Sequence, residues 1–308
     1  MKDLFNLKIG IGTWAWGDRL IWSYGNAYSM TDIREAFQAS LDLGLTFFDT
    51  AEVYGRGLSE KILGTFIEDN QQNNDILIAS KFMPFPWRLS KASLLRALKN
   101  SLKRLNLQTL FLYQINMPLP PISIRTWMDA LADVYHSGLI ENIGVSNFDV
   151  EQTKIAYERL KFHGIRLASN QVEYNLINRK IEKNGVKEIC DALNIRVIAY
   201  SPLAMGILTG KYSSDAPPSG PRSRRYSPRR LGKIQPLLKV IKKIGNAYDG
   251  KSPSQIALNW LISKGVLPIP GAKNQTQVIL NTGALGWHLK ESELAELDEV
   301  SNGIYLDS

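Results

Sequence analysis

Short apolar segments alternate with longer amphipathic segments along most of this chain of 308 residues. The short segments are rich in β-branched and aromatic residues and are bounded by turn-forming residues, which is typical of buried strands. We expect eight strands, within residues 7–14, 45–50, 75–81, 110–116, 140–147, 166–172, 195–201 and 265–271.

The longer segments have the period of amphipathic helices. Residues 90–105 place leucines on one helical face behind Ser90, a suitable N-cap. Residues 31–44 have a similar pattern, with Thr31 or Asp32 as the N-cap. A strand–helix alternation repeated this many times predicts an all-parallel sheet with both faces covered.

Eight parallel strands can close into a barrel or form an open, doubly wound sheet. An open dinucleotide-binding sheet would carry G-x-G-x-x-G after its first strand, but GIGTWAWG at 10–17 continues through tryptophans before any helical pattern starts. We therefore predict the α/β class and a (β/α)8 TIM barrel. One domain over 1–308 is expected, with a basic Pro/Ser/Arg-rich loop at about 213–233.

The formal net charge of +8 has a local source in this loop. Its stretch SGPRSRRYSPRRLGK contains five arginines and a lysine without an acidic residue. The loop is either a solvated surface segment or a mobile basic flap that contacts an anionic ligand such as a nucleotide phosphate. We expect no nucleic-acid binding, because no aromatic residues are interleaved at base-stacking spacing.

Targeting signals and membrane spans are not predicted. The start, MKDLFNLKIGIGTW, has no signal-peptide core and no Arg/Ser-rich presequence, and no later run is long enough for a bilayer. We expect a cytoplasmic protein, or a plastid stromal one if a transit peptide has been removed, with no membrane partner. The single cysteine, Cys190, is interpreted as a packing residue. No metal site is predicted, and the oligomeric state is left open.

Polar side chains follow nearly every predicted strand, and barrel enzymes build their sites at this end of the strands. In chain order they are Asp49, Tyr54, Lys81, Asn116, Ser146, Asn147, Asn170, Gln171, Tyr200 and Ser201. Any one of these residues, taken singly, would be interpreted as a capping or loop residue. A lysine at a barrel mouth is costly without a carboxylate, however, and Asp49 is the nearest in strand order. A phenol has a pKa of about 10, and an adjacent cation favours its phenolate, which suits general acid catalysis by Tyr54 on a carbonyl oxygen.

Several motifs, taken in order, resemble the aldo-keto reductase family over nearly the whole chain. They are GIGTW, FFDTAEVYG, IASKF, GVSNF, YSPLAMGILTGKY and IPGAKN. PWRLS, GPRS and GALGWHL are similar to the plant and cyanobacterial branch that includes pyridoxal reductases. The resemblance implies a (β/α)8 barrel that binds NADPH without a Rossmann domain. It also implies hydride transfer to an aldehyde or ketone and a tyrosine that protonates the nascent alkoxide.

The resemblance assigns roles by position. Tyr54 would be the acid, Lys81 the cation that lowers its pKa, and Asp49 the carboxylate that holds Lys81. The family's fourth catalytic residue is usually a histidine, where this chain has Asn116. An amide can donate a hydrogen bond to a carbonyl oxygen but cannot relay a proton. Potassium-channel β subunits of the family also carry asparagine there. Two classes therefore stay open: an NADPH-dependent carbonyl reductase, and an NADPH-binding sensor with vestigial activity.

The candidate cofactor site combines residues from several strand ends. Tyr200 offers a flat face for stacking on a nicotinamide ring. Lys273 stands just before a helix start and, with Arg222 of the basic loop, favours NADPH over NADH. The full set is Thr13, Trp14, Ser146, Asn147, Gln171, Tyr200, Ser201, Pro202, Leu203, Gly206, Leu208, Gly210, Lys211, Arg222, Gly271, Lys273, Gln277 and Asn281.

The substrate site is less clearly defined. Trp14, Trp22, Phe85 and Trp87 all lie in segments that follow strands. They either wall a flat aromatic site or pack against the core. Together with the branch resemblance, they favour a small-molecule carbonyl partner such as pyridoxal or another aromatic aldehyde.

Overall fold

The computed structural model describes residues 3–70, 75–302 and 304. Eight strands form one sheet in the order β1 to β8, and every neighbouring pair is parallel. The strands are β1 (Ile11–Gly12), β2 (Phe47–Asp49), β3 (Leu77–Phe82), β4 (Leu112–Ile115), β5 (Ile143–Ser146), β6 (Leu167–Glu173), β7 (Arg196–Tyr200) and β8 (Leu267–Pro268).

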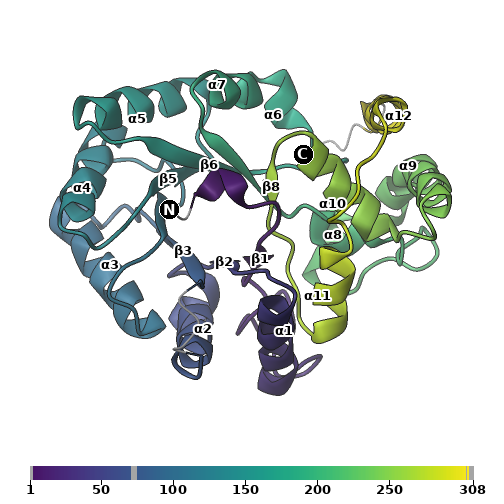
Figure 1. Cartoon of the computed structure of the whole chain (residues 1–308), viewed down its shortest axis with the longest axis horizontal. Coiled ribbons are helices and arrows are strands. Elements are labelled where there is room, and N and C mark those ends of the chain that lie inside the picture. Colours follow the sequence, from purple (N-terminus) through teal and green to yellow (C-terminus); the bar gives the residue numbers. More distant parts are fainter. Residues whose placement is uncertain (1–2, 71–74, 303, 305–308) are drawn as a thin grey trace.

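The end of the sheet at β8 meets β1 and closes the barrel. The Gly10 amide donates to the carbonyl of Pro268 at 3.0 Å, and the Gly12 amide donates to that of Pro270 at 3.0 Å. A Cβ at Gly12 would lie 2.9 Å from the carbonyl oxygen of Ile269, so this close approach requires glycine. The predicted (β/α)8 barrel is confirmed (Figure 1).

Helices surround the strands (Figure 1). Those that follow successive strands are α1 (Met30–Asp42), α2 (Leu58–Glu68), α3 (Lys91–Leu105), α4 (Ile124–His136), α5 (Val150–Phe162), α7 (Val186–Ala192), α10 (Pro253–Ser263) and α11 (Gln275–Thr282). The additional helices are α6 (Lys180–Lys183), α8 (Pro221–Arg225), α9 (Pro228–Ala247) and α12 (Glu291–Asn302), with the 3-10 helices η1 (Leu4–Asn6), η2 (Tyr54–Gly57) and η3 (Ala204–Thr209).

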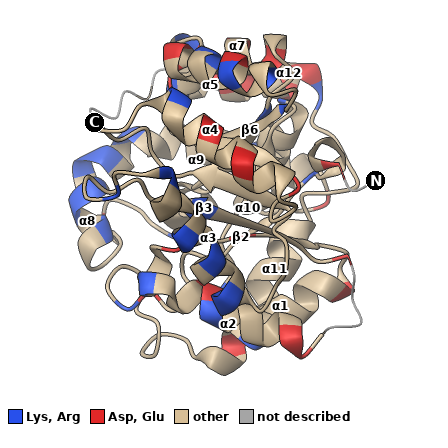
Figure 2. Cartoon of the chain, turned by 90° about the vertical axis from the view of Figure 1, so that its left-hand side faces the viewer, with Lys and Arg blue, Asp and Glu red and all other residues tan. Residues whose placement is uncertain are grey.

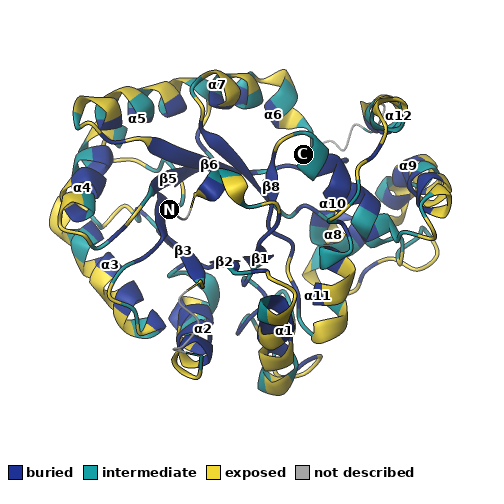
Figure 3. Cartoon of the chain, viewed as in Figure 1, coloured by how far each residue is buried: buried dark blue, intermediate teal, exposed yellow. Residues whose placement is uncertain are grey.

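Apolar side chains pack both outside and inside the barrel. Outside, the helices bury their inner faces against the strands and expose their outer faces (Figure 3). Inside, Leu4 of η1 packs with inward side chains such as Phe47 and Phe111. Arg196, the first residue of β7, donates to the carbonyl of Leu7 at 3.0 Å, which places η1 at the N-terminal ends of the strands. The opposite end is left for the polar side chains.

The start of α1 differs from the prediction. Ser29 is the N-cap, and neither Thr31 nor Asp32 takes that position. The Ser29 hydroxyl accepts from the Asp32 amide at 3.4 Å, and the Asp32 carboxylate accepts from the Ser29 amide at 2.7 Å. Asp32 is therefore the reciprocal partner in a capping box, which satisfies two amides at once.

The segment expected to be a basic loop at 213–233 is partly helical. It contains α8 and the beginning of α9. Ser227 caps α9 and Pro228 occupies its first turn, where the missing amide of proline costs nothing. Tyr226 between the two helices is buried, so this segment is anchored in the core.

The position of Cys190 agrees with its interpretation as a packing residue. Cys190 lies buried in α7, and burial raises the pKa of its thiol to about 12, as expected for a packing residue. Within the described ranges, no helix is both long and apolar enough to cross a membrane.

Candidate active site

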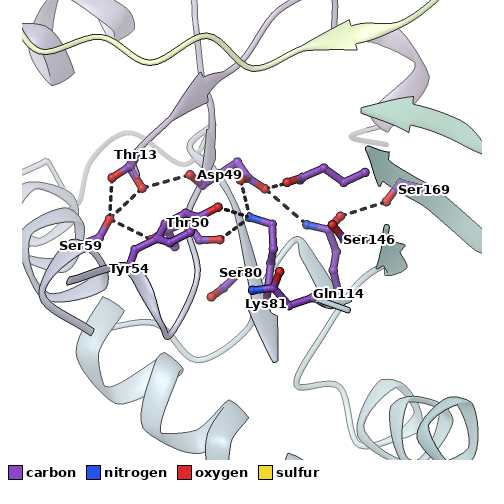
Figure 4. A network of polar contacts seen from close by, with 12 residues as sticks. Thr13, Asp49, Thr50, Tyr54, Ser59, Ser80, Lys81, Gln114, Ser146 and Ser169 are labelled. Atoms are coloured by element: carbon purple, nitrogen blue, oxygen red, sulfur yellow. Dashed lines mark hydrogen bonds and ion pairs between the residues drawn. The ribbon is translucent and has the colours of Figure 1, made fainter. Parts of the chain in front are cut away.

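Three polar side chains meet at the C-terminal ends of β2 and β3. Asp49 ends β2, Lys81 lies near the end of β3, and Tyr54 begins η2. Asp49 is in register with Ala79, and Lys81 lies two residues further along the strand, so its side chain points to the same face. The Lys81 Nζ lies 2.5 Å from Asp49 Oδ1 and 3.4 Å from the Tyr54 hydroxyl (Figure 4). The structure thus brings together the predicted acid, cation and carboxylate.

The Lys81–Asp49 ion pair is buried, with each side chain only 1% exposed. Burial lowers the pKa of Lys81, but Asp49 and Tyr54 outweigh burial and hold this pKa above its ordinary value. A third hydrogen bond runs from Lys81 Nζ to the carbonyl of Thr50 at 2.8 Å. The ammonium group is therefore charged at neutral pH, and all its donors are used.

The Tyr54 hydroxyl is subject to opposing effects. Burial raises its pKa, Lys81 lowers it, and Asp49 raises it, so that the pKa lies above the ordinary value of 10.0. The predicted lowering by Lys81 is present, but it is smaller than the effect of burial. The phenol is consequently protonated at neutral pH, as a proton donor must be.

Two glutamines hold the other oxygen of Asp49. Gln171 in β6 donates from Nε2 to Asp49 Oδ2 at 2.8 Å, and Gln114 in β4 donates to the same oxygen at 3.4 Å. Gln171 was predicted to be a cofactor-binding residue, and its bond to Asp49 uses one of the two N–H donors of its amide. Gln114 was not predicted, although an amide inside an apolar strand is a signal for such a role.

Asn147 links the ends of three strands. Its Nδ2 donates to the carbonyl of Asn116 and to the Ser146 hydroxyl, each at 3.1 Å, and its Oδ1 accepts from the Tyr200 hydroxyl at 3.0 Å. This bond orients the Tyr200 ring, and burial raises the Tyr200 pKa to about 12. The Asn116 side chain makes no hydrogen bond to the part of the chain that the structure describes, so its amide is available to a ligand.

A cavity of about 430 Å³ extends from Asp49 and Tyr54 across the end of the barrel. Its lining includes these predicted cofactor residues: Trp14, Tyr200, Ser201, Pro202, Leu203, Gly206, Lys211, Arg222, Gly271, Lys273, Gln277 and Asn281. It also includes Trp22 and residues without a predicted ligand role, among them Met205, Thr209, Ser252, Ser254 and Leu280. Ser252 is also the N-cap of α10.

Other predicted site residues do not line this cavity. They are Thr13, Lys81, Phe85, Trp87, Asn116, Ser146, Asn147, Gln171, Leu208 and Gly210. Thr13 is fully buried and donates to the carbonyl of Asp49 at 3.0 Å. Phe85 and Trp87 stack on each other in the loop after β3, with ring centroids 4.6 Å apart.

The turn after β7 has an unusual backbone. Ser201, Ala204 and Met205 have φ values of 49°, 49° and 56°, and Gly206 has 94°. Left-handed conformations at non-glycine residues cost on the order of 1 kcal/mol or more each, and such strain is concentrated at functional sites. The turn lines the cavity, so the strained backbone lies where a ligand would contact it.

Three cations line one part of the cavity: Lys211, Arg222 and Lys273. Arg222 belongs to α8, on which Figure 2 shows Lys and Arg gathered. Lys273 Nζ lies 4.7 Å from the ring centroid of Trp22, and the Arg222 guanidinium lies 5.5 Å from it. Burial, together with Arg222 and Lys211, lowers the pKa of Lys273 to about 8. Trp22, predicted to wall the substrate site, thus contacts two cations. An anionic ligand would relieve the repulsion among these cations.

The comparisons with known proteins agree with this fold. The aldo/keto reductase family model matches residues 8–302, so the chain belongs to the aldo/keto reductase family, as predicted. A chloroplastic pyridoxal reductase of Arabidopsis thaliana is 40% identical over 310 aligned positions, which cover 97% of this chain and 84% of the relative. An uncharacterized oxidoreductase of Mycobacterium tuberculosis is 38% identical, with coverage of 90% and 84%.

Solved structures show the same architecture. An aldo/keto reductase of Klebsiella pneumoniae, crystallised with NADP and acetate, has a TM-score of 0.74 and 30% identity over 96% of this chain and 91% of its own. A glycerol dehydrogenase of Gluconobacter oxydans has a TM-score of 0.82 and 27% identity, with coverage of 98% and 93%.

Proposed function

We propose that this protein is an NADPH-dependent reductase that converts an aldehyde or ketone to the alcohol. The observation that carries the proposal is the buried Lys81–Asp49 pair beside the protonated phenol of Tyr54 at the edge of a large cavity. NADPH, when bound, supplies the hydride. Tyr54 gives its proton to the substrate oxygen, and Lys81 stabilises the phenolate that this leaves.

Asp49 and Asn116 have supporting roles in this mechanism. Asp49, held by two glutamines, keeps Lys81 charged and aimed at Tyr54. Asn116 lies close to the end of β3, because its backbone amide donates to the carbonyl of Phe82 at 2.8 Å, and its side-chain amide makes no hydrogen bond within the described residues. We infer that this amide donates a hydrogen bond to the carbonyl oxygen and orients the substrate.

The cavity suits NADPH by its lining residues and its charges. Tyr200 would stack on the nicotinamide, and the strained turn after β7 would present its backbone to the pyrophosphate. Lys273 and Arg222 would bind the additional phosphate that distinguishes NADPH from NADH. The Klebsiella pneumoniae relative crystallised with NADP supports the same choice.

An aromatic aldehyde such as pyridoxal is the substrate that we propose. The Trp14 and Tyr54 rings lie 6.2 Å apart, and Trp22 meets Trp14 edge-on at 5.6 Å, so flat aromatic walls stand beside the proton donor. The name of the Arabidopsis thaliana relative supports pyridoxal. The test is NADPH consumption with aromatic, aliphatic and dicarbonyl compounds, pyridoxal included. Turnover of other aldehydes without pyridoxal would refute the pyridoxal proposal alone.

A sensor that binds NADPH with vestigial chemistry is a second candidate, favoured by Asn116 alone. Tight NADPH binding with negligible turnover of every carbonyl compound would support it.

Asn116→His tests whether the missing histidine limits the rate. If Tyr54 is the acid, an imidazole can donate to the substrate oxygen in place of the amide and, unlike an amide, can relay a proton. We expect kcat to rise by about tenfold if the missing relay limits the rate. Steady-state kinetics with NADPH in excess would measure it. An unchanged or lower kcat would mean that Asn116 is adapted to its own substrate.

Lys273 should make NADPH affinity dependent on pH. Its pKa is about 8 because of burial and the neighbouring cations, and a bound phosphate would raise it. Affinity should therefore be constant below pH 8 and fall by about tenfold per unit as pH rises further. Dissociation constants from fluorescence titration between pH 6.5 and 9.5, chosen to bracket this pKa, would check the slope.

Two variants isolate this effect. Lys273→Arg keeps the charge at all these pH values and should abolish the slope while retaining affinity. Lys273→Met should weaken NADPH binding by about tenfold to a hundredfold and leave NADH binding nearly unchanged. An equal loss for both cofactors would place Lys273 away from the distinguishing phosphate.

A further inference from the structure

A partly buried ion pair joins the loop that carries Tyr54 to the loop that follows β3. Glu52 stands two residues before Tyr54, and Arg88 lies seven residues after Lys81. The Arg88 guanidinium forms two parallel bonds with the Glu52 carboxylate, at 2.5 and 3.1 Å. The Glu52 side chain is 8% exposed and that of Arg88 is 23% exposed. Paired geometry with little exposure makes this a rigid contact.

Both partners are also bonded to the same backbone segment. Glu52 Oε1 accepts from the Met83 amide at 2.7 Å, and Arg88 donates to the Met83 carbonyl at 3.0 Å. Residues 83–88 therefore curl around the Arg88 guanidinium, and the Glu52 carboxylate holds Met83 at the start of this segment. A substitution of either Glu52 or Arg88 would therefore alter the conformation of both loops.

The same guanidinium supports a pair of stacked aromatic rings. It lies 4.9 Å from the ring centroid of Phe82 and 5.4 Å from that of Phe85. The Phe85 and Trp87 rings are stacked with an interplanar angle of 6°, and Trp87 is 72% exposed. An exposed indole in an ordered stack is a preformed surface for a flat apolar ligand, since little entropy is lost on contact.

This stack belongs to the same end of the barrel as the catalytic residues. The loop begins directly after β3, where the Phe82 carbonyl accepts from the Asn116 amide. Leu89 in this loop and Met117 in the loop after β4 are further exposed apolar side chains. None of these side chains lines the cavity beside Tyr54, so they would contact only the outer part of a substrate.

We propose that Glu52 and Arg88 are specificity-determining positioning residues, which hold the Phe85–Trp87 stack as an outer wall for flat aromatic aldehydes. The inference rests on the proposed reductase function and adds a reason for substrate choice. Glu52 and Arg88 do not touch the reacting atoms. They act through the position of the aromatic stack.

The test uses three variants of the pair and one matched control. Arg88→Met removes the charge, Arg88→Lys keeps it without the planar fork, and Glu52→Gln keeps the acceptor for Met83. The control is Arg159→Met. Arg159 forms the same two-bond pair with Asp129, at 2.5 and 3.0 Å, and lies over Phe162 at 5.0 Å, but on the outer helices α4 and α5.

Kinetics would compare 2-naphthaldehyde with propanal. In Arg88→Met we expect kcat/KM for 2-naphthaldehyde to fall by about tenfold, mainly through KM, with a change of less than about twofold for propanal. Glu52→Gln and Arg88→Lys should show smaller losses of the same kind, because each keeps part of the contact. Arg159→Met should leave the ratio of the two substrates unchanged.

Folding and function are separated by two further measurements. Trp87→Leu changes an exposed side chain and should reproduce the loss of selectivity even if Arg88→Met does not fold. Binding of 2-naphthalenemethanol to the NADPH-bound protein requires no turnover and should weaken by about tenfold in Arg88→Met.

The outcomes distinguish this inference from the proposed function. A wild-type protein that turns over neither these two aldehydes nor any other carbonyl compound contradicts the reductase proposal, and binding of the alcohol then decides the role of the pair. Folded Arg88 and Trp87 variants with wild-type selectivity and wild-type affinity for the alcohol would overturn the inference.

Discussion

Replacing Tyr54 with phenylalanine is expected to reduce carbonyl reduction by about 10²- to 10⁴-fold, the range of general acid catalysis, with NADPH affinity unchanged. In the proposed mechanism the phenol is the proton donor and lies 3.4 Å from the charged Lys81; phenylalanine keeps the ring and removes the proton. Initial rates with excess NADPH would measure the loss, and fluorescence titration would measure cofactor binding.

The pH profile provides an independent check on Tyr54. Because burial holds its pKa above the ordinary value of 10.0, the acid form persists through neutral pH. We therefore expect the wild-type kcat to be independent of pH below the raised pKa of Tyr54 and to fall as pH rises through this pKa. Unfolding by urea should be nearly unaffected in Tyr54→Phe, since the 3.4 Å bond to Lys81 is long. Turnover that survives the substitution would show that another group is the acid.

Lys81→Met is expected to cause a comparable loss of activity together with a loss of stability. The Asp49 carboxylate would stay buried without its cation, with only the amides of Gln171 and Gln114 as partners. Breaking a buried pair in this way costs about 3–5 kcal/mol of the free energy of unfolding. Urea denaturation and initial rates would measure the two effects.

The paired substitution separates stability from catalysis. Asp49→Leu combined with Lys81→Met removes both charges, so it should recover most of the stability and none of the activity. Lys243→Met is the control, because its pair with Glu296 is exposed, at 70% and 34%, and should change stability by less than about 1 kcal/mol. A double variant no more stable than Lys81→Met would contradict the view that the unpaired Asp49 carboxylate causes the loss of stability.

Much of the barrel could be predicted because buried parallel strands are continuous apolar runs. All eight observed strands begin inside their predicted ranges. The shortest, β1 and β8, are rich in glycine and proline, which limit the ladder. The N-cap of α1 was misassigned because Ser29, Thr31 and Asp32 are all capable caps. Only the backbone path shows that Ser29 and Asp32 bond reciprocally.

The candidate site could be predicted in part. The sequence places three residues at strand ends and within family motifs: Asp49, Tyr54 and Lys81. The close approach of their side chains was therefore expected. Gln114 and the Glu52–Arg88 pair were not expected, because an ion pair depends on how two loops curl. Phe85 and Trp87 follow a strand as Trp14 does, yet only Trp14 lines the cavity.

The sequence by itself determined which residues stand at the mouth of the barrel, since strand ends are set by local apolar runs and the turns that bound them. Only the tertiary structure decided how these residues are paired and charged. Gln171 is 122 positions from Asp49 along the chain but 2.8 Å away in space. The pKa of Tyr54 lies above its ordinary value because burial outweighs Lys81, and burial is a property of the folded chain.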